Sequence, residues 1–303
     1  MKSVQRAPRK RRGTEERNPR SRELDRLSTL GLVRAIQRED ATVPAAVQKE
    51  LPAIARAVDA IIDGLSRGGR LIYVGAGTSG RLGTLDAAEC PPTFGVSPKL
   101  VQAVVAGGRR GLTFSVEGAE DDARQGTRDL ESKRITRADV VVGITASGST
   151  PYVLGALQLA RQRGAATIAV TANRGTPIER LARITIATET GPEVVAGSTR
   201  MKAGTAQKLV LNMLSTASMI RLGHVYNNWM VDVALTNEKL RLRGLRILQE
   251  ATGSGAAEAA RALKQARNRL RVALVMLKMK AGPREAERRL QRAGGNLRRA
   301  LGE

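Results

Sequence analysis

The sequence predicts an α/β protein in which helices cover both faces of a parallel sheet. Between residues 71 and 187, short apolar runs alternate with helical stretches. These runs lack the alternation of apolar and polar residues that marks a half-exposed strand, so both of their faces are expected to be buried. Two of the runs lead directly into loops rich in glycine, serine and threonine.

The expected elements can be justified in chain order. Apolar residues recur at helical spacing over residues 24–39, and Thr42 followed by Val43 and Pro44 is typical of the start of a second helix that ends near residue 66. Strands are then expected at the apolar runs, with helices between them. The strands are 71–74, 100–105, 140–144, 167–171 and 184–187, and the helices lie around 79–89, 115–132, 151–163 and 176–182.

The last third of the chain is expected to be helical. An apolar stripe predicts a long helix over 204–222, and another is expected over 229–247. Beyond Gly253-Ser254-Gly255 the pattern restarts, so a boundary is expected near residue 252 between a domain over 21–252 and a small all-helical domain over 253–303. The helices of the small domain are expected near 256–265, 266–280 and 283–291, with a last one from 296.

The net charge of +23 lies mainly at the two ends of the chain. Residues 1–22 carry nine basic and two acidic residues, and residues 241–303 carry sixteen basic and five acidic ones. Residues 1–20 are polar and rich in arginine, so disorder is expected there. With 2% aromatic residues and no recognisable nucleic-acid motif, the pattern favours a solvated basic surface over a nucleic-acid partner.

Several classes of protein are not expected. No apolar run reaches the length of a membrane span, and the N-terminus lacks the apolar segment of a secretory signal, so a cytoplasmic protein is expected. One cysteine excludes a disulfide framework within the chain. His224 is expected to be a surface residue in a turn and Cys90 a small core residue, so no metal site is expected.

The two hydroxyl-rich loops are the candidate binding site. The first follows the strand at 71–74 and contains Gly77, Thr78 and Ser79. The second follows the strand at 140–144 and contains Thr145, Ser147 and Thr150. The first N–H groups of a helix lack partners within it, and the helix macrodipole makes that end attractive to anions. Two such loops in one domain therefore favour a single phosphate held between two strand ends, as in a sugar phosphate.

Glycine-rich loops after strands also occur in nucleotide-binding sites and as ordinary turns. Gly75, Gly77 and Gly80 fit the G-x-G-x-x-G spacing of a dinucleotide site, but no acidic residue stands clearly in the ribose-binding position near 106–108. The Walker pattern is absent. The remaining alternative is that both loops are ordinary turns between strands and helices.

Carboxylates are the main candidates for acid and base catalysis. Glu89 closes the helix that begins at the first loop and is expected to end at Pro91-Pro92. Glu117 and Glu120 follow the strand that ends near residue 105. Each could reach a ligand at the strand ends. Spacing alone equally allows each of them to be a solvated charge on a helix.

At this point the chain resembles the N-acetylmuramic acid 6-phosphate etherases, a branch of the sugar isomerase (SIS) domain family. The resemblance covers about residues 17–303, and the run at 197–209 and the Glu-Cys-Pro-Pro motif at 89–92 are its most specific parts. The matching stretches are 17–21, 71–80, 85–93, 116–121, 146–152, 197–209 and 236–240.

The resemblance implies a flavodoxin-like sheet, a homodimer and cleavage of the D-lactyl ether of a phosphorylated amino sugar, with no metal or nicotinamide cofactor. By motif, Glu89 matches the proton donor and Glu120 the second catalytic carboxylate, whereas Glu117 matches a residue without that role. Phosphate-binding positions are matched by Ser79, Ser147 and Thr150. The sequence departs from the family at Ser149, where an arginine is usual.

Three other functions share features with this sequence. A non-catalytic sugar-phosphate sensor would resemble the glucokinase regulatory protein, but that relative has two SIS domains in a much longer chain. A SIS-type transcription regulator usually carries an N-terminal helix-turn-helix, which about 20 basic residues cannot form. A sugar-phosphate isomerase would share the proton removal at carbon 2, and the Glu-Cys-Pro-Pro motif argues against it.

Overall fold

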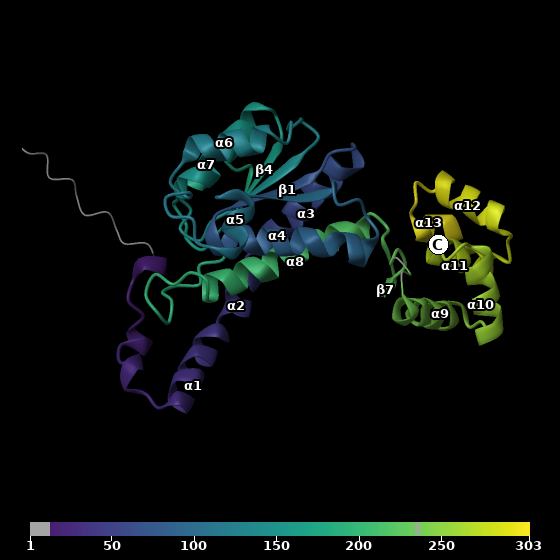
Figure 1. The fold of residues 1–303 in the computed structure, drawn as a ribbon, viewed down its shortest axis with the longest axis horizontal. Coiled ribbons are helices and arrows are strands. Elements are labelled where there is room, and N and C mark those ends of the chain that lie inside the picture. The colour runs from purple at the N-terminus through teal and green to yellow at the C-terminus, as the bar shows by residue number, and fades with distance from the viewer. Residues whose placement is uncertain (1–12, 234, 236) are drawn as a thin grey trace, which may run out of the picture. The chain divides into compact units, whose positions relative to one another are not determined.

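A five-stranded parallel sheet forms the centre of the structure, which confirms the predicted fold class. The computed structural model describes residues 13–233, 235 and 237–303 (Figure 1). The strand order is β2-β1-β3-β4-β5, and each neighbouring pair is parallel, which is the flavodoxin-like arrangement. The strands are β1 (Leu71–Gly75), β2 (Val101–Val105), β3 (Val140–Ile144), β4 (Ala166–Thr171) and β5 (Ile184–Ala187), each within one residue of the prediction.

The chain forms two compact units. The first takes in the chain up to Asp86 together with Val101–Leu214, and it holds the sheet. The second takes in Ala87–Leu100 and Ser215–Glu303. Two helices, α4 (Gly77–Phe94) and α8 (Lys202–Arg221), begin in the first unit and end in the second.

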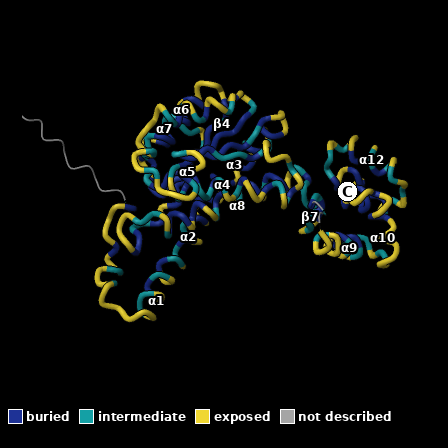
Figure 2. The backbone as a smooth tube through the Cα atoms, in the orientation of Figure 1, coloured by how far each residue is buried: buried dark blue, intermediate teal, exposed yellow. Residues whose placement is uncertain are grey.

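Helices cover both faces of the sheet in the first unit. Ile72, Val141 and Ala169 face a buried cluster with α7, and α6 packs on α7. On the other face, α3 contacts four of the strands. Figure 2 shows the strands buried at the centre and the outer helix faces exposed. The helices of this unit are α1 (Thr29–Asp40), α2 (Val43–Gln48), α3 (Leu51–Ser66), α5 (Gly108–Thr113), α6 (Ala123–Glu131) and α7 (Pro151–Gln162), with 3₁₀ turns at Gly13–Glu15, Pro19–Ser21, Leu24–Arg26 and Pro177–Arg180.

Several predicted helices have different bounds. The helix expected over 24–39 is a 3₁₀ turn followed by α1, because the Ser28 side chain caps Gly31 N–H. The helix expected over 42–66 is broken into α2 and α3, and Pro52 lies in the first turn of α3. Over 115–132 only α6 is helical, since Asp122 caps it at Gln125 N–H.

The predicted stop at Pro91-Pro92 is wrong. These two prolines lie inside α4, which ends only at Phe94. A proline removes one hydrogen bond from a helix and disfavours it without excluding it, and here it falls in the last turn. The helix expected over 229–247 is also wrong in its first half, where Trp229–Met230 forms β7, a short antiparallel partner of β6 (Val225–Tyr226).

The prediction of disorder for residues 1–20 is wrong for residues 13–20. Thr14 is fully buried, and its N–H and hydroxyl both contact the Asn173 side chain. Asn18 is also buried and donates to Glu39 at 2.7 Å. The polar composition of this segment predicted disorder, because composition alone does not reveal hydrogen-bond partners elsewhere in the chain. The rest of that prediction falls on residues 1–12, outside the described residues.

A buried ion pair joins α1 to the start of α8. Lys202 Nζ lies 2.9 Å from Glu39 Oε2, and both side chains are at most 2% exposed. Burial alone would raise the pKa of Glu39, but hydrogen bonds from Lys202 and Asn18 and the charges of Lys202 and Arg20 outweigh it and lower that pKa. The carboxylate of Glu193, itself buried, accepts from the N–H groups of Lys202 and Ala203 at 2.9 Å each and so caps α8.

The second unit has a helical core of its own. Its helices are α9 (Glu238–Thr252), α10 (Ala256–Gln265), α11 (Leu270–Met279), α12 (Pro283–Arg292) and α13 (Leu297–Leu301). Tyr226, Val231 and Leu248 belong to the same apolar cluster as Leu263 and Leu274. Because this cluster takes in residues before 252, the unit begins earlier in the chain than the boundary expected near residue 252. In the part of the chain that the structure describes, no helix is long and apolar enough to cross a membrane.

His224 is not the surface residue that the sequence predicted. Its Nδ1 lies 2.7 Å from Asp232 Oδ2, and its side chain is 23% exposed. Arg271 pairs with the same carboxylate and offsets its charge. Burial, with help from the Arg271 charge, lowers the pKa of His224 to about 4.

The buried ion pair predicts a strong coupling between Lys202 and Glu39. The Lys202→Met variant should lose about 3–5 kcal/mol of unfolding free energy, because it leaves the Glu39 carboxylate buried without its main partner. Replacing both residues, as Lys202→Met with Glu39→Leu, should recover part of this loss. Urea denaturation of the two variants and the parent measures both values. If the double variant were less stable than the single one, the coupling would be absent.

The neutral His224 predicts that stability falls as the pH is lowered. Unfolding exposes a histidine of ordinary pKa, near 6.5, so the unfolded state takes up more protons than the folded state between that value and about 4. Stability should therefore drop by about 2 kcal/mol between pH 7 and pH 5. Because this is the only histidine, His224→Gln should remove most of the drop. Denaturant titrations at both pH values provide the measurement, and an unchanged slope in the variant would contradict it.

Candidate functional site

A cavity of 570 Å³ opens at the carboxyl ends of β1 and β3. Gly75 and Ile144 are register partners, so the two strands end side by side. The strand order reverses at this pair, which is where ligands bind in open α/β sheets. The side chains and backbone around the cavity come from Glu15, residues 76–79, Glu120, Asp121, residues 144–147, residues 149–151, Gly197 and Thr199.

The first loop makes a tight turn from β1 into α4. A Cβ atom on Gly75 would lie 2.6 Å from Gly80 N, so the turn closes only without side chains there. Gly77 has a φ of 52°, a conformation that glycine adopts without strain. Gly77, Thr78 and Ser79 all line the cavity at the N-terminal end of α4. The loop therefore presents backbone and hydroxyl groups together with the positive end of a helix.

Ser79 is paired with a glutamine that the loop pattern did not reveal. Its hydroxyl lies 2.9 Å from Gln207 Oε1, and both residues are buried. Gln207 Nε2 has no hydrogen-bond partner within the described residues. Turning this amide over would place Nε2 on Ser79 Oγ, and the hydroxyl hydrogen would then be available to a ligand.

The second loop carries a chain of four hydroxyl groups. Thr150 Oγ1 and Thr145 Oγ1 are 2.7 Å apart, and Thr145 Oγ1 is 3.3 Å from Ser147 Oγ. Ser147 Oγ is in turn 3.2 Å from Ser149 Oγ. Because every hydroxyl both donates and accepts, this chain can turn its hydrogens toward an anion in the cavity. The three residues predicted in this loop are thus brought together, and Ser149 joins them.

The start of α7 is held by Glu120. Pro151 has no N–H group, and Tyr152 N–H donates to Glu120 O at 3.0 Å. The first N–H groups of α7 are therefore already hydrogen-bonded within the protein. The N-terminal end of α7 can still attract an anion through the nearby hydroxyl groups and through the helix macrodipole. The same hydrogen bond ties the backbone of Glu120 to the second loop, and Glu120 lines the cavity as predicted.

Glu15 is the residue of the site that sequence reasoning missed most clearly. It lines the cavity and its Oε2 lies 3.7 Å from the position of a Cβ atom on Gly197. Its neighbour Thr14 contacts Asn173, and Asn173 Nδ2 donates to Ala146 O at 2.8 Å in the second loop. The segment that carries Glu15 is therefore attached to the second loop itself.

The other missed residues are Asp121, Gly197 and Thr199. The run at 197–209 stood out as a motif but carried no assigned role, and its first residues form part of the cavity wall. No lysine or arginine lines the cavity among the described residues, whereas three carboxylates do. Within the same residues no cluster of histidine, cysteine, aspartate or glutamate could hold a metal ion.

Glu89 and Glu117 do not line this cavity. Glu117 lies in a neighbouring hollow of 350 Å³ that shares Gly77 and Glu120 with it. Arg81 supports the segment before Glu117, since its guanidinium donates to Leu112 O at 2.9 Å and to Phe114 O at 3.0 Å. Glu89 is exposed on the part of α4 that belongs to the second unit. Cys90 beside it is buried and free of disulfides, as predicted.

Comparisons with known protein families identify the fold. Residues 114–217 match the SIS domain, and residues 53–161 match the N-terminal SIS domain of the glucokinase regulatory protein. A candidate phosphosugar isomerase from Bacteroides fragilis has a solved structure that covers 65% of this chain and 95% of its own, with a TM-score of 0.50 and 22% identity. This likeness supports the SIS fold.

Closer relatives extend over nearly the whole chain. The N-acetylmuramic acid 6-phosphate etherase of Geobacillus thermodenitrificans is 54% identical over 95% of this chain and 98% of its own length. The etherase of Yersinia pestis is 53% identical over the same shares. In both comparisons the similarity covers nearly the whole of the two proteins. The chain therefore belongs to the N-acetylmuramic acid 6-phosphate etherase family.

Proposed function

We propose that the protein cleaves the D-lactyl ether of N-acetylmuramic acid 6-phosphate, giving N-acetylglucosamine 6-phosphate and D-lactate. The observation that carries this proposal is the cavity where two hydroxyl-bearing loops and the Glu120 carboxylate converge. Membership of the etherase family supports the choice of substrate and reaction. The reaction belongs to the recycling of cell-wall amino sugars, and we place it in the cytoplasm.

The phosphate of the substrate would lie between the two loops. Gly77, Thr78 and Ser79 offer N–H and hydroxyl donors on one side, and the hydroxyls of Thr145, Ser147 and Thr150 lie on the other. Hydrogen bonds to a charged acceptor are stronger than neutral ones, so several hydroxyls can replace a basic side chain. The bound phosphate group is remote from the reacting carbons, and its binding can hold those carbons in position for the chemistry.

The chemistry requires one group that takes a proton and one that gives one. In the open-chain sugar the aldehyde acidifies the hydrogen on carbon 2. A base removes that proton, the ether oxygen on carbon 3 leaves as lactate after accepting a proton, and water then adds to carbon 3. We assign Glu120 as the base, since it lines the cavity, and Glu89 as the acid on the strength of the family motif.

Two features of the proposal rest on the family alone, namely the homodimer and the role of Glu89 as the acid. We propose a homodimer as the functional form, as the resemblance implies. Glu89 is exposed on α4, so its carboxylate is accessible for a role in catalysis. The remaining alternative, a non-catalytic sugar-phosphate regulator, would bind the same ligand without releasing D-lactate. Incubation with the substrate and assay of D-lactate separates the two.

Isotope labels test the elimination and rehydration. In deuterated water, N-acetylglucosamine 6-phosphate should carry deuterium on carbon 2, because the proton removed there exchanges with solvent. In ¹⁸O-labelled water the label should enter the hydroxyl on carbon 3. Mass spectrometry locates both labels. Absence of deuterium at carbon 2, together with ¹⁸O in lactate, would show that lactate is displaced directly and would rule out elimination.

Carboxamide variants test the two assigned carboxylates. Glu120→Gln and Glu89→Gln should each reduce kcat by roughly 10²–10⁴ with the melting temperature nearly unchanged, because the side chains have almost the same shape. Glu120→Gln should also abolish exchange at carbon 2, which Glu89→Gln should partly retain. Glu117→Gln is the matched control, since Glu117 lies in the neighbouring hollow, and it should keep most activity. Full exchange in Glu120→Gln would contradict its role as base.

A hydroxyl deletion tests the phosphate site. Ser147→Ala should weaken binding of N-acetylmuramic acid 6-phosphate by about 1.5–3 kcal/mol, the value of a hydrogen bond to a charged group. The effect should vanish with the unphosphorylated sugar, which lacks the group that Ser147 contacts. Ser132→Ala, which removes an exposed hydroxyl on the end of α6, serves as control. Equal losses with both sugars in Ser147→Ala would place the phosphate elsewhere.

A further inference from the structure

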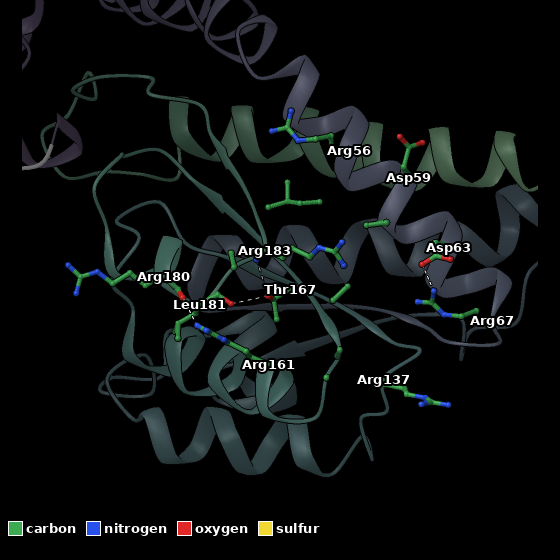
Figure 3. Close-up of a pocket in the computed structure, with 16 residues that line it drawn as sticks. Arg56, Asp59, Asp63, Arg67, Arg137, Arg161, Thr167, Arg180, Leu181 and Arg183 are labelled. Atoms are coloured by element: carbon green, nitrogen blue, oxygen red, sulfur yellow. Dashed lines mark hydrogen bonds and ion pairs between the residues drawn. The ribbon is translucent and has the colours of Figure 1, made fainter.

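A second and larger cavity lies at the opposite edge of the sheet. It measures 830 Å³ and is bounded by the first residues of β4 and β5, at their amino ends, and by α3 (Figure 3). The candidate catalytic cavity lies at the carboxyl ends of β1 and β3. The strands between the two edges are four to six residues long, or about 13–20 Å. A ligand in one cavity is thus separate from a ligand in the other.

The walls of this cavity are strongly basic. Figure 3 shows arginine side chains around the hollow that come from α3, from the segment before β3, from the end of α7 and from the segment before β5. Of the residues that the structure describes, Asp59 and Asp63 are the only acidic ones in the lining. The arginines are Arg56, Arg67, Arg137, Arg161, Arg180 and Arg183.

Most of this positive charge is not neutralised by the protein. Arg67 pairs with Asp63 and Arg161 donates to Arg180 O at 2.8 Å. Within the residues that the structure describes, the guanidinium groups of Arg56, Arg137, Arg180 and Arg183 make no ion pair or hydrogen bond. Like charges that converge on one hollow repel one another, and a bound anion relieves that repulsion.

The backbone that carries these arginines is fixed. Arg183 N–H donates to Thr167 O at 2.9 Å, and Thr167 Oγ1 donates to Leu181 O at 2.9 Å, so the segment before β5 is tied to the start of β4. The segment with Arg137 is held by the buried Asp139 carboxylate, which accepts from Thr136 N–H and Arg70 N–H at 2.8 Å each. The arginines around the hollow thus stand on ordered backbone, and Figure 3 shows the side chains of Arg56, Arg161 and Arg183 nearest its middle.

We propose that this cavity is a binding site for a small anion with several phosphate groups. Its volume falls within the range of about 300–1,000 Å³ typical of small-molecule sites. Arginine suits phosphate because its planar group makes paired hydrogen bonds with phosphate oxygens. Six arginines against two aspartates leave the lining with a net charge of +4, which matches an oligophosphate better than the single phosphate of a sugar. Among the described residues, the lining holds no aromatic side chain on which a nucleic-acid base could stack.

Calorimetric titration with tripolyphosphate tests the proposal. The full-length protein should bind it at 0.15 M KCl, and binding should weaken as the salt concentration rises. The variant Arg56→Gln with Arg183→Gln should weaken binding about a hundredfold, or about tenfold for each guanidinium group removed. Both residues are exposed, so the variant should keep its melting temperature. Ser147→Ala should bind tripolyphosphate as the parent does, because its change lies in the other cavity.

A charge-matched control separates this site from general attraction to a basic protein. Arg34→Gln with Arg284→Gln removes two exposed arginines outside the cavity and should leave the affinity for tripolyphosphate unchanged. Equal affinity in the parent and the cavity variant would overturn the proposal, as would the absence of binding up to millimolar concentrations. Binding of single-stranded RNA that requires Arg56 and Arg183, without binding of tripolyphosphate, would replace the small anion by a nucleic acid.

Discussion

The reversal of strand order between β1 and β3 is the constraint on which the candidate site depends. Parallel strands send their carboxyl ends to one edge of the sheet, and the chain crosses to β2 on one side and to β4 and β5 on the other. The loops after β1 and β3 therefore diverge and leave a hollow between them. Register pairing of Gly75 with Ile144 sets both loops at the same level. A shift of this register would separate the hydroxyls that now face one cavity.

The wall of the hollow is completed by segments far apart in the sequence. Thr14 reaches the second loop through Asn173, and this holds Glu15 at the cavity. The Lys202–Glu39 ion pair joins the start of α8, which lies within the run at 197–209, to α1, and Asn18 donates to the same Glu39. Charges buried in this way are costly unless every partner is in place, so they favour one arrangement of the N-terminal segment. The run at 197–209 therefore has two structural roles. Its first residues form part of the cavity wall, and Lys202 holds α1 and the N-terminal segment in place.

Much of the sheet and half of the site could be predicted because the signals were local. Apolar runs located each strand of the five-stranded sheet within one residue, and the glycine and hydroxyl pattern located both loops. The other features depend on contacts between residues that are far apart in the sequence. The order of residues 13–20 comes from Asn173 and Glu39, which no local pattern connects to them. The lowered pKa of His224 arises in the same way, from burial and from the charge of Arg271. The continuation of α4 through Pro91-Pro92 was missed because proline lowers helix propensity without forbidding the last turn.

The absence of lysine and arginine from the lining of the candidate catalytic cavity, within the described residues, has a consequence for selectivity. The chain carries a net charge of +23, so its long-range field attracts anions of every kind. Inside the cavity, Glu15, Glu120 and Asp121 oppose that attraction, and only short directional contacts from hydroxyl and N–H groups favour a ligand. The charge of the whole chain thus attracts anions, whereas the selection among them takes place inside the cavity. Chloride and other simple anions gain little by entering, whereas the phosphate of the proposed substrate would be retained by donors that match its oxygens.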